Sequence, residues 1–327
     1  MIARRSVWAD EQVAALAAKF VAAADEVHHL QHGDDAECKL FQQLAEQGHY
    51  AGRTEPSDTR QGIYACTTTG VLLASINTNE PRRMRRMLER ALERWNELPR
   101  EQRVVADLGE PDLNRLEARY PKDGLVLHQY SRDLEREPAL RDWRANAWNQ
   151  DFVWFTRAEA RALAPVTLEV GATTPWPSDL ARRLARCHLV DNVRGQVSAF
   201  RRGSVEKAEL QSCVTAVADG RATLEFRGVS RTTENGAWPV AGFKDRAVPG
   251  EQSRGFHAEL AGRAVFELAS QRFVEFELAA VGLRFGGSQF NGRDGDLEPA
   301  PMGVWFELAS DAPAEHVAPA LVWEYGW

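Results

Sequence analysis

The stretch "ELQSCVTAVADGRATLEFRGVS", residues Glu209–Ser230, decides the fold expected for the C-terminal part of the chain. Apolar and polar residues alternate on both sides of Asp219-Gly220, a dipeptide typical of two-residue β-hairpin turns. A second pair of alternating segments, "FHAELAGRAVFEL" and "RFVEFELAAVG", follows, and "GVWFELA" supplies a last strand. We therefore expect an antiparallel β-rich domain over residues 186–327.

The same alternation predicts which side chains of the second hairpin share one face, because successive strand residues point to opposite sides of a sheet. In the first strand of this hairpin the shared face holds Phe256, Ala258, Leu260, Ala264, Phe266 and Leu268. In the next strand it holds Val274, Phe276 and Leu278. This face is the expected core of the C-terminal domain.

The first third of the chain mixes helical and strand patterns. Residues 62–76, "GIYACTTTGVLLASI", read as two strands around a turn that ends in Gly70, and residues 81–98 carry apolar side chains at helical spacing. Upstream, residues 20–27, "FVAAADEV", form a short apolar run that we expect to be a strand. The stretch "HHLQHGDDAEC" follows as a loop, and a helix is expected from about Asp35 to Gln47, ended by Gly48.

This order of strand, loop, helix, hairpin and helix resembles the thioredoxin-like fold over roughly residues 6–98. Two features of that family are missing here. Only Cys38 lies where the family places a Cys-x-x-Cys pair, and Thr59-Arg60-Gln61 stands where it has a proline before the hairpin. An ordinary dithiol–disulfide oxidoreductase is therefore not expected. The whole layout also resembles uncharacterised bacterial two-domain proteins with a thioredoxin-like front half, which implies no activity.

These patterns together predict an α+β protein in three parts. A thioredoxin-like α/β domain is expected at residues 1–98, a mixed α/β connecting region at 99–185, and the antiparallel β-rich domain at 186–327. A chain of 327 residues is long enough for two domains. The connecting region contains the strand-like segment "LVLHQYSRDL" and a dense group of aromatic residues between Trp143 and Phe155.

Composition and charge narrow the class of protein. The formal charge of −7 argues against a broad nucleic-acid surface, and no run approaches the roughly 20 apolar residues of a membrane span. Four widely spaced cysteines without a CxxC pair suggest neither a disulfide framework nor a zinc ribbon. We expect a cytoplasmic protein that acts on a small-molecule or thiol substrate, with its oligomeric state left open.

The first candidate site is Cys38 with His28, His29 and His32. A cysteine near a helix N-terminus has its thiolate favoured by the helix dipole, and imidazole together with thiolate suits zinc or copper. The spacing matches no metal motif. Three interpretations therefore stay open: a metal site, a reactive thiol, and a solvated loop in which Cys38 packs as a small apolar residue.

The second candidate site is "CHLVDNVRGQ". A helix here would place His188 and Asp191 on one face as a general base and its orienting carboxylate, while Arg194 would hold an anionic substrate. The alternative is a capped helix end with an ion pair. His128 and Asp151 are isolated candidates that would join His188 if the two domains form a cleft.

The glycine-rich residues 282–303 lack the strand–loop–helix context of a phosphate-binding loop. We expect a long loop whose polar residues cover a site. Those polar residues are Arg284, Asn291, Arg293 and Asp294. No G-x-S-x-G or HExxH motif is present. The sequence thus leaves three functional hypotheses: a metal- or thiol-dependent enzyme, a non-catalytic binding or scaffold protein, and a His/Asp-based hydrolase-like enzyme.

Overall fold

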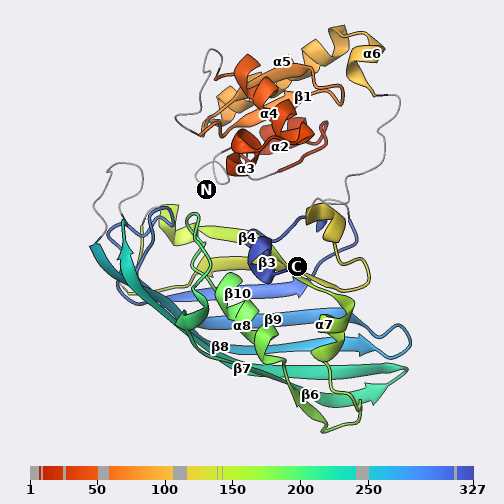
Figure 1. Cartoon of the computed structure of the whole chain (residues 1–327), viewed down its shortest axis with the longest axis vertical. Coiled ribbons are helices and arrows are strands. Elements are labelled where there is room, and N and C mark those ends of the chain that lie inside the picture. The colour runs from red at the N-terminus through yellow and green to blue at the C-terminus, as the bar shows by residue number, and fades with distance from the viewer. Residues whose placement is uncertain are drawn as a thin grey trace. The chain divides into compact units, whose positions relative to one another are not determined.

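A computed structural model describes residues 7–8, 10–24, 27–50, 59–105, 116–137, 139–141, 143–240, 250–312 and 315–327. The chain divides into two compact units, Met1–Pro111 and Asp112–Trp327 (Figure 1). Over the ranges that the structure describes, no helix is long and apolar enough to span a membrane.

The N-terminal unit packs helices against one β-hairpin. Its elements are α2 (Glu11–Ala17), α3 (Val27–His32), α4 (Ala36–Gln47), β1 (Ile63–Cys66), β2 (Leu72–Ile76), α5 (Pro81–Glu97) and α6 (Arg100–Arg103). The strands β1 and β2 pair antiparallel. Helix α5 buries Met84, Met87 and Leu88 in a core that includes Leu73 of β2. The expected hairpin, the helix after it and the helix that ends at Gly48 are confirmed.

The strand expected at residues 20–27 is wrong over its described residues. Residues 21–24 have no regular structure, and Val27 begins the helix α3. The side chain of Val21 is 99% exposed, so this alanine-rich run has no apolar face with which to join a sheet. The histidine-rich stretch is accordingly a short helix and a turn. Among the described residues the sheet of this unit has two strands, and a thioredoxin-like architecture is not confirmed.

The C-terminal unit is built on an antiparallel sheet of eight strands in the order β4-β3-β10-β9-β8-β7-β6-β5. The strands are β3 (Leu125–Asp133), β4 (Trp148–Phe155), β5 (Thr173–Pro175), β6 (Val205–Ala218), β7 (Arg221–Trp238), β8 (Gly250–Glu267), β9 (Arg272–Phe285) and β10 (Ala300–Leu308). The helices are α7 (Arg157–Ala162) and α8 (Ser178–Cys187), with the 3-10 turns η1 (Leu116–Arg119), η2 (Trp143–Asn146), η3 (Arg202–Ser204) and η5 (Val322–Tyr325). Helices α7 and α8 lie on one face, here called the inner face, and the opposite face is called the outer face (Figure 1).

Residues 99–185 do not form a separate connecting region, because β3, β4 and β5 belong to this sheet. Strand β3 lies between β4 and β10, and so pairs with a strand that comes about 170 residues later in the chain. A local pattern carries no information about such a distant partner. The expected α+β class with an antiparallel C-terminal sheet is confirmed, but the sheet extends further toward the N-terminus than expected.

The register confirms most of the expected core of the hairpins. Asp219 and Gly220 both have positive φ, 51° and 72°, as a two-residue hairpin turn of the primed type requires. The expected face of β8 is buried from Phe256 to Phe266. Val274 was placed wrongly: a β-bulge shifts the pairing, so Phe273 lies opposite Phe266 and takes the buried position.

Candidate functional site

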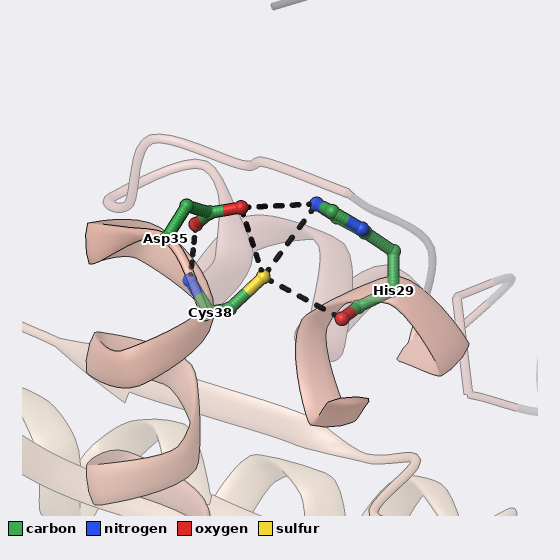
Figure 2. A group of neighbouring side chains, drawn as sticks. All are labelled: His29, Asp35 and Cys38. Atoms are coloured by element: carbon green, nitrogen blue, oxygen red, sulfur yellow. Dashed lines mark hydrogen bonds and ion pairs between the residues drawn. The ribbon is translucent and has the colours of Figure 1, made fainter. Parts of the chain in front are cut away.

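His29, Asp35 and Cys38 bring one donor atom each to a common point in the N-terminal unit (Figure 2). The Sγ of Cys38 lies 3.5 Å from Nε2 of His29 and 3.2 Å from Oδ2 of Asp35. The third edge, from Nε2 of His29 to Oδ2 of Asp35, is 3.3 Å. Among the described residues, this is the group of His, Cys, Asp and Glu side chains whose donor atoms lie close enough to hold one ion.

The start of helix α4 positions two of these residues. Asp35 is the N-cap of α4, and its Oδ1 accepts a hydrogen bond of 2.8 Å from the backbone N–H of Cys38. The other carboxylate oxygen, Oδ2, is therefore turned toward the sulfur and the imidazole (Figure 2). One side chain thus caps the helix and also supplies a donor atom to the group.

Packing between α3 and α4 brings His29 to the other two residues. The Nε2 of Gln42 on α4 donates to the carbonyl oxygens of Leu30 and Gly33, at 3.2 and 2.9 Å, and ties the end of α3 to α4. Gly33 makes the close approach possible, because a Cβ at this position would lie 2.5 Å from Sγ of Cys38.

The electrostatics of the group favour an ionised carboxylate. Hydrogen bonds from the backbone N–H and then the side chain of Cys38 lower the pKa of Asp35 below its usual value. Cys38 is fully buried, whereas the side chains of His29 and Asp35 are about half exposed. The group is therefore open to solvent on its histidine and carboxylate side and closed on its sulfur side.

The other two histidines proposed as ligands are not part of this group. His32 lies in the last turn of α3, and its ring is not among the clustered donors. The side chain of His28 lies outside the described residues. Sequence reasoning therefore found Cys38 and His29 but missed Asp35. The signal for Asp35 was its position three residues before Cys38, which is that of an N-cap.

The second candidate site does not form as expected, because α8 ends at Cys187 and His188 is its C-cap. His188 and Asp191 therefore do not share a helix face. The Nδ1 of His188 lies 3.0 Å from Oε1 of Gln129, and its Nε2 lies 2.5 Å from the hydroxyl of Tyr325. Burial, followed by the positive charge of Arg183, lowers the pKa of His188 to about 3.

Asp151 lies near His188, as expected, but 3.9 Å separates its Oδ2 from Nδ1 of the imidazole. Asp151 instead accepts hydrogen bonds of 2.8 Å from the backbone N–H groups of Phe152 and Ala320. His188 is fully buried. A general base that takes a proton from substrate must come within hydrogen-bond distance of it, and His188 has no exposed surface through which to do so.

His128 does not join His188, since the two belong to opposite faces of the sheet. Gln129, the partner of His188, points to the inner face, so its neighbour His128 points to the outer face. There the imidazole stacks between Tyr130 and Phe152, with ring centroids 4.3 and 4.6 Å away. Asp151 and His188 therefore lie close together within the C-terminal unit, and His128 does not join them.

Asp191 and Arg194 belong to a buried network of charges, and they do not pair with each other as a helix would have required. Both carboxylate oxygens of Asp191 accept from Arg293, at 2.6 Å each. Arg194 donates to Asp133 at 2.8 Å and to Asp296 at 2.6 Å. Arg194 is buried between two carboxylates, which occupy the guanidinium that was expected to hold an anionic substrate.

The network joins distant parts of the chain. Asp133 ends β3, Arg284 lies near the end of β9, and Arg293 and Asp296 belong to the glycine-rich segment after β9. Burial raises the pKa of the Asp133 carboxyl, but hydrogen bonds and charge from Arg293 and Arg194 outweigh it and lower that pKa. The glycine-rich segment is thus fastened to the sheet by buried ion pairs.

Inward-facing polar residues of β3 explain how the segment after α8 is held. Gln129 contacts His188, Ser131 donates to Asn192 at 2.7 Å, and Asp133 pairs with Arg194. Sequence reasoning missed these three β3 residues. No local signal marks them, because polar side chains occupy both faces of the strand from His128 to Asp133. Only the position of β3 in the sheet shows that Gln129, Ser131 and Asp133 are the buried set.

In comparisons with known proteins, the chain matches no family model, no curated protein and no solved structure.

Proposed function

We propose that this protein binds a zinc ion in its N-terminal unit through Cys38, His29 and Asp35. The observation that carries the proposal is the spacing of the three donor atoms, 3.5, 3.3 and 3.2 Å. Zinc–ligand distances of about 2.0–2.3 Å at tetrahedral angles place neighbouring donors about 3.4–3.6 Å apart. The side chains therefore need little movement to hold the ion.

The chemistry of the donors also suits zinc. A thiolate and a carboxylate together balance the two positive charges of Zn²⁺, and a neutral imidazole completes a mixed S, N, O set. Copper(I) prefers softer ligands and gains less from the carboxylate of Asp35. Three protein ligands leave the fourth position of a tetrahedron for water or for a substrate, as in catalytic zinc sites. This arrangement supports the hypothesis of a metal-dependent enzyme over that of a scaffold.

The metal content of the purified, untagged chain tests the proposal. We expect close to one zinc ion per chain, and a competition titration with a chromophoric chelator gives its affinity. Cobalt(II) in place of zinc reports the sulfur ligand through its thiolate charge-transfer absorption. A small thiol or azide should shift the cobalt bands if the fourth position is open.

Three ligand variants carry matched controls. Asp35→Asn keeps an N-cap side chain for α4 but removes the carboxylate, and the control Asp10→Asn changes the N-cap of α2 in the same way. For Cys38→Ser the control is Cys66→Ser, and the third variant is His29→Gln. We expect each ligand variant to lower zinc affinity by roughly 100-fold or more, and the controls to leave it unchanged.

Circular dichroism shows whether each variant keeps its helices. Copper bound in preference to zinc, and lost in the ligand variants, would retain the ligands and reassign the ion. No zinc, copper or cobalt binding by the parent chain would remove the metal site and leave the reactive-thiol and scaffold hypotheses. Equal affinities in Asp35→Asn and Asp10→Asn would show that the carboxylate serves only as a helix cap.

A further inference from the structure

The outer face of the C-terminal sheet carries an exposed group of aromatic and aliphatic side chains. Trp148 on β4 is 45% exposed, Trp305 on β10 is 38% exposed, and Tyr130 on β3 lies between these strands, half-buried. Val281 and Leu283 on β9 are each about half exposed. These five residues are called the aromatic patch. Helices α7 and α8 lie on the other face of the sheet (Figure 1).

The strand register fixes how the rings are spaced. Trp305 lies directly opposite Tyr130, while Trp148 lies opposite Arg132, two residues further along β3. The two tryptophans are thus separated by two strand spacings and two residues, which places their Cα atoms about 12 Å apart. A platform of this length is longer than one sugar ring and fits a short oligosaccharide.

Polar groups stand among the rings. The indole Nε1–H of Trp305 donates to Oε2 of Glu307 at 3.2 Å, which fixes one edge of the ring. Arg132 and Gln150 are exposed on the same face as Tyr130. Donors and acceptors of this kind match the hydroxyl groups on the edge of a pyranose, and the flat indole faces match its C–H groups.

The size of the patch argues against a second protein molecule as its occupant. Its two tryptophans and two aliphatic residues expose roughly 400 Å² in total, given about 250 Å² for a whole tryptophan. Each partner in a stable protein interface contributes about 800 Å². An exposed apolar patch of this size is common at ligand-binding sites of monomers.

The charges near the patch argue for a neutral ligand. Arg132 lies opposite Trp148, and Glu307 and Glu315 lie near Tyr130, so the field around the patch is mixed in sign and complements neither a polyanion nor a polycation. The chain as a whole carries a formal charge of −7, which repels nucleic acids. Aromatic stacking without a charge requirement is therefore the recognition chemistry that this face offers.

We propose that the outer face of β4, β3, β10 and β9 binds a neutral oligosaccharide or polysaccharide, with Trp305 and Trp148 as its stacking platforms. This site is separate from the proposed zinc site and does not depend on it.

Native gel electrophoresis of the full chain in gels that contain hydroxyethylcellulose, barley β-glucan, xylan, galactomannan or pullulan tests the proposal. Calorimetry with the hexasaccharide of whichever polymer retards the chain gives the affinity. We expect retardation by at least one polymer, and about tenfold weaker binding for Trp305→Ala and for Trp148→Ala, because one stacked ring contributes about that much. Trp305→Phe should bind with intermediate affinity.

The matched control is Trp323→Ala, a tryptophan that is 57% exposed on η5 and lies outside the patch. Near-ultraviolet circular dichroism and urea midpoints establish that the variants fold, and Trp305→Phe supplies the test if Trp305→Ala does not. Retardation of the parent chain by none of the polymers would overturn the proposal, and so would equal losses in Trp323→Ala and Trp305→Ala. A parent dimer that Trp305→Ala dissociates in sedimentation would also overturn it, by assigning the face to self-association.

Discussion

Replacement of His188 by glutamine should change how the stability of the C-terminal unit depends on pH. His188 is fully buried, and burial lowers its pKa to about 3. In the unfolded chain the same imidazole titrates near 6.5. Between these two pKa values the unfolded state binds a proton that the folded state does not bind, so a lower pH favours unfolding.

The magnitude follows from the two pKa values. One proton of difference costs at most about 1.4 kcal/mol per pH unit, so the parent chain loses about 2 kcal/mol of this contribution between pH 6.5 and 4.5. From the unfolded pKa down to the folded pKa, the stability lost through His188 would total roughly 5 kcal/mol. Below the folded pKa the imidazole is protonated in both states, and no further stability is lost. His188→Gln lacks this titration. It should be less stable than the parent at pH 7.5, by about 1–3 kcal/mol for its altered hydrogen bonds, and should close or reverse that gap at pH 4.5.

Urea unfolding followed by tryptophan fluorescence measures this effect. Eight of the ten tryptophans lie after residue 111, so the signal reports chiefly on the C-terminal unit. The quantity of interest is the difference in unfolding free energy between variant and parent at pH 7.5, 6.5, 5.5 and 4.5. Carboxylates whose pKa is lowered, such as Asp133, contribute to both proteins and cancel in that difference.

His257→Gln, on the outer face, is the matched control and should run parallel to the parent. A constant free-energy difference between His188→Gln and the parent across the whole pH range would refute the reasoning. It would mean that His188 accepts a proton in the folded protein, through water or through movement of Tyr325.

Three further substitutions test other parts of the structure. Arg293→Met should lower the free energy of unfolding by about 3–5 kcal/mol, because it leaves buried carboxylates unpaired. Adding Asp133→Asn to this variant should restore part of the loss. A change below about 1 kcal/mol in urea unfolding of Arg293→Met would contradict this expectation. Gly220→Ala should lower the free energy of unfolding by about 1 kcal/mol in the same assay, because φ is 72° at this position. The control Gly203→Ala should change it little, because Gly203 has open space around it and no positive φ. Equal effects of the two substitutions would argue against backbone strain at Gly220. Gly33→Ala should weaken zinc binding at least tenfold in chelator competition, because the new Cβ would lie 2.5 Å from Sγ of Cys38. Unchanged zinc affinity would mean that the backbone at residue 33 shifts without disturbing the three ligands.

Part of the metal site was predictable from the chain and part was not. A cysteine at the start of a helix, close in sequence to histidines, marked the region. Which histidine reaches the sulfur depends on the short helix α3 and its packing on α4, which selects His29 and leaves His32 outside the group. Asp35 has a local role as a cap, and its second role follows only from where α3 lies.

In the C-terminal unit, by contrast, local spacing predicted the wrong partners for the charged candidates. Asp191 and Arg194 are spaced for a helical ion pair, but the helix ends before them and each pairs with a residue about 60–100 positions away. Charged side chains removed from water must find partners, and those partners come from whichever segments the sheet brings together. Spacing within one segment could not identify them.

The sequence by itself determined the local elements: the hairpin turn at Asp219-Gly220, the alternating faces of β8, and the helix α5 with its apolar stripe. These depend on backbone preferences and side-chain periodicity, which act between neighbours. Tertiary structure alone decided that β3 pairs with β10, that the outer face gathers tryptophans from β4 and β10, and that His188 is buried. Each of these depends on contacts between residues far apart in the chain, whose free energy exists only once the sheet has formed.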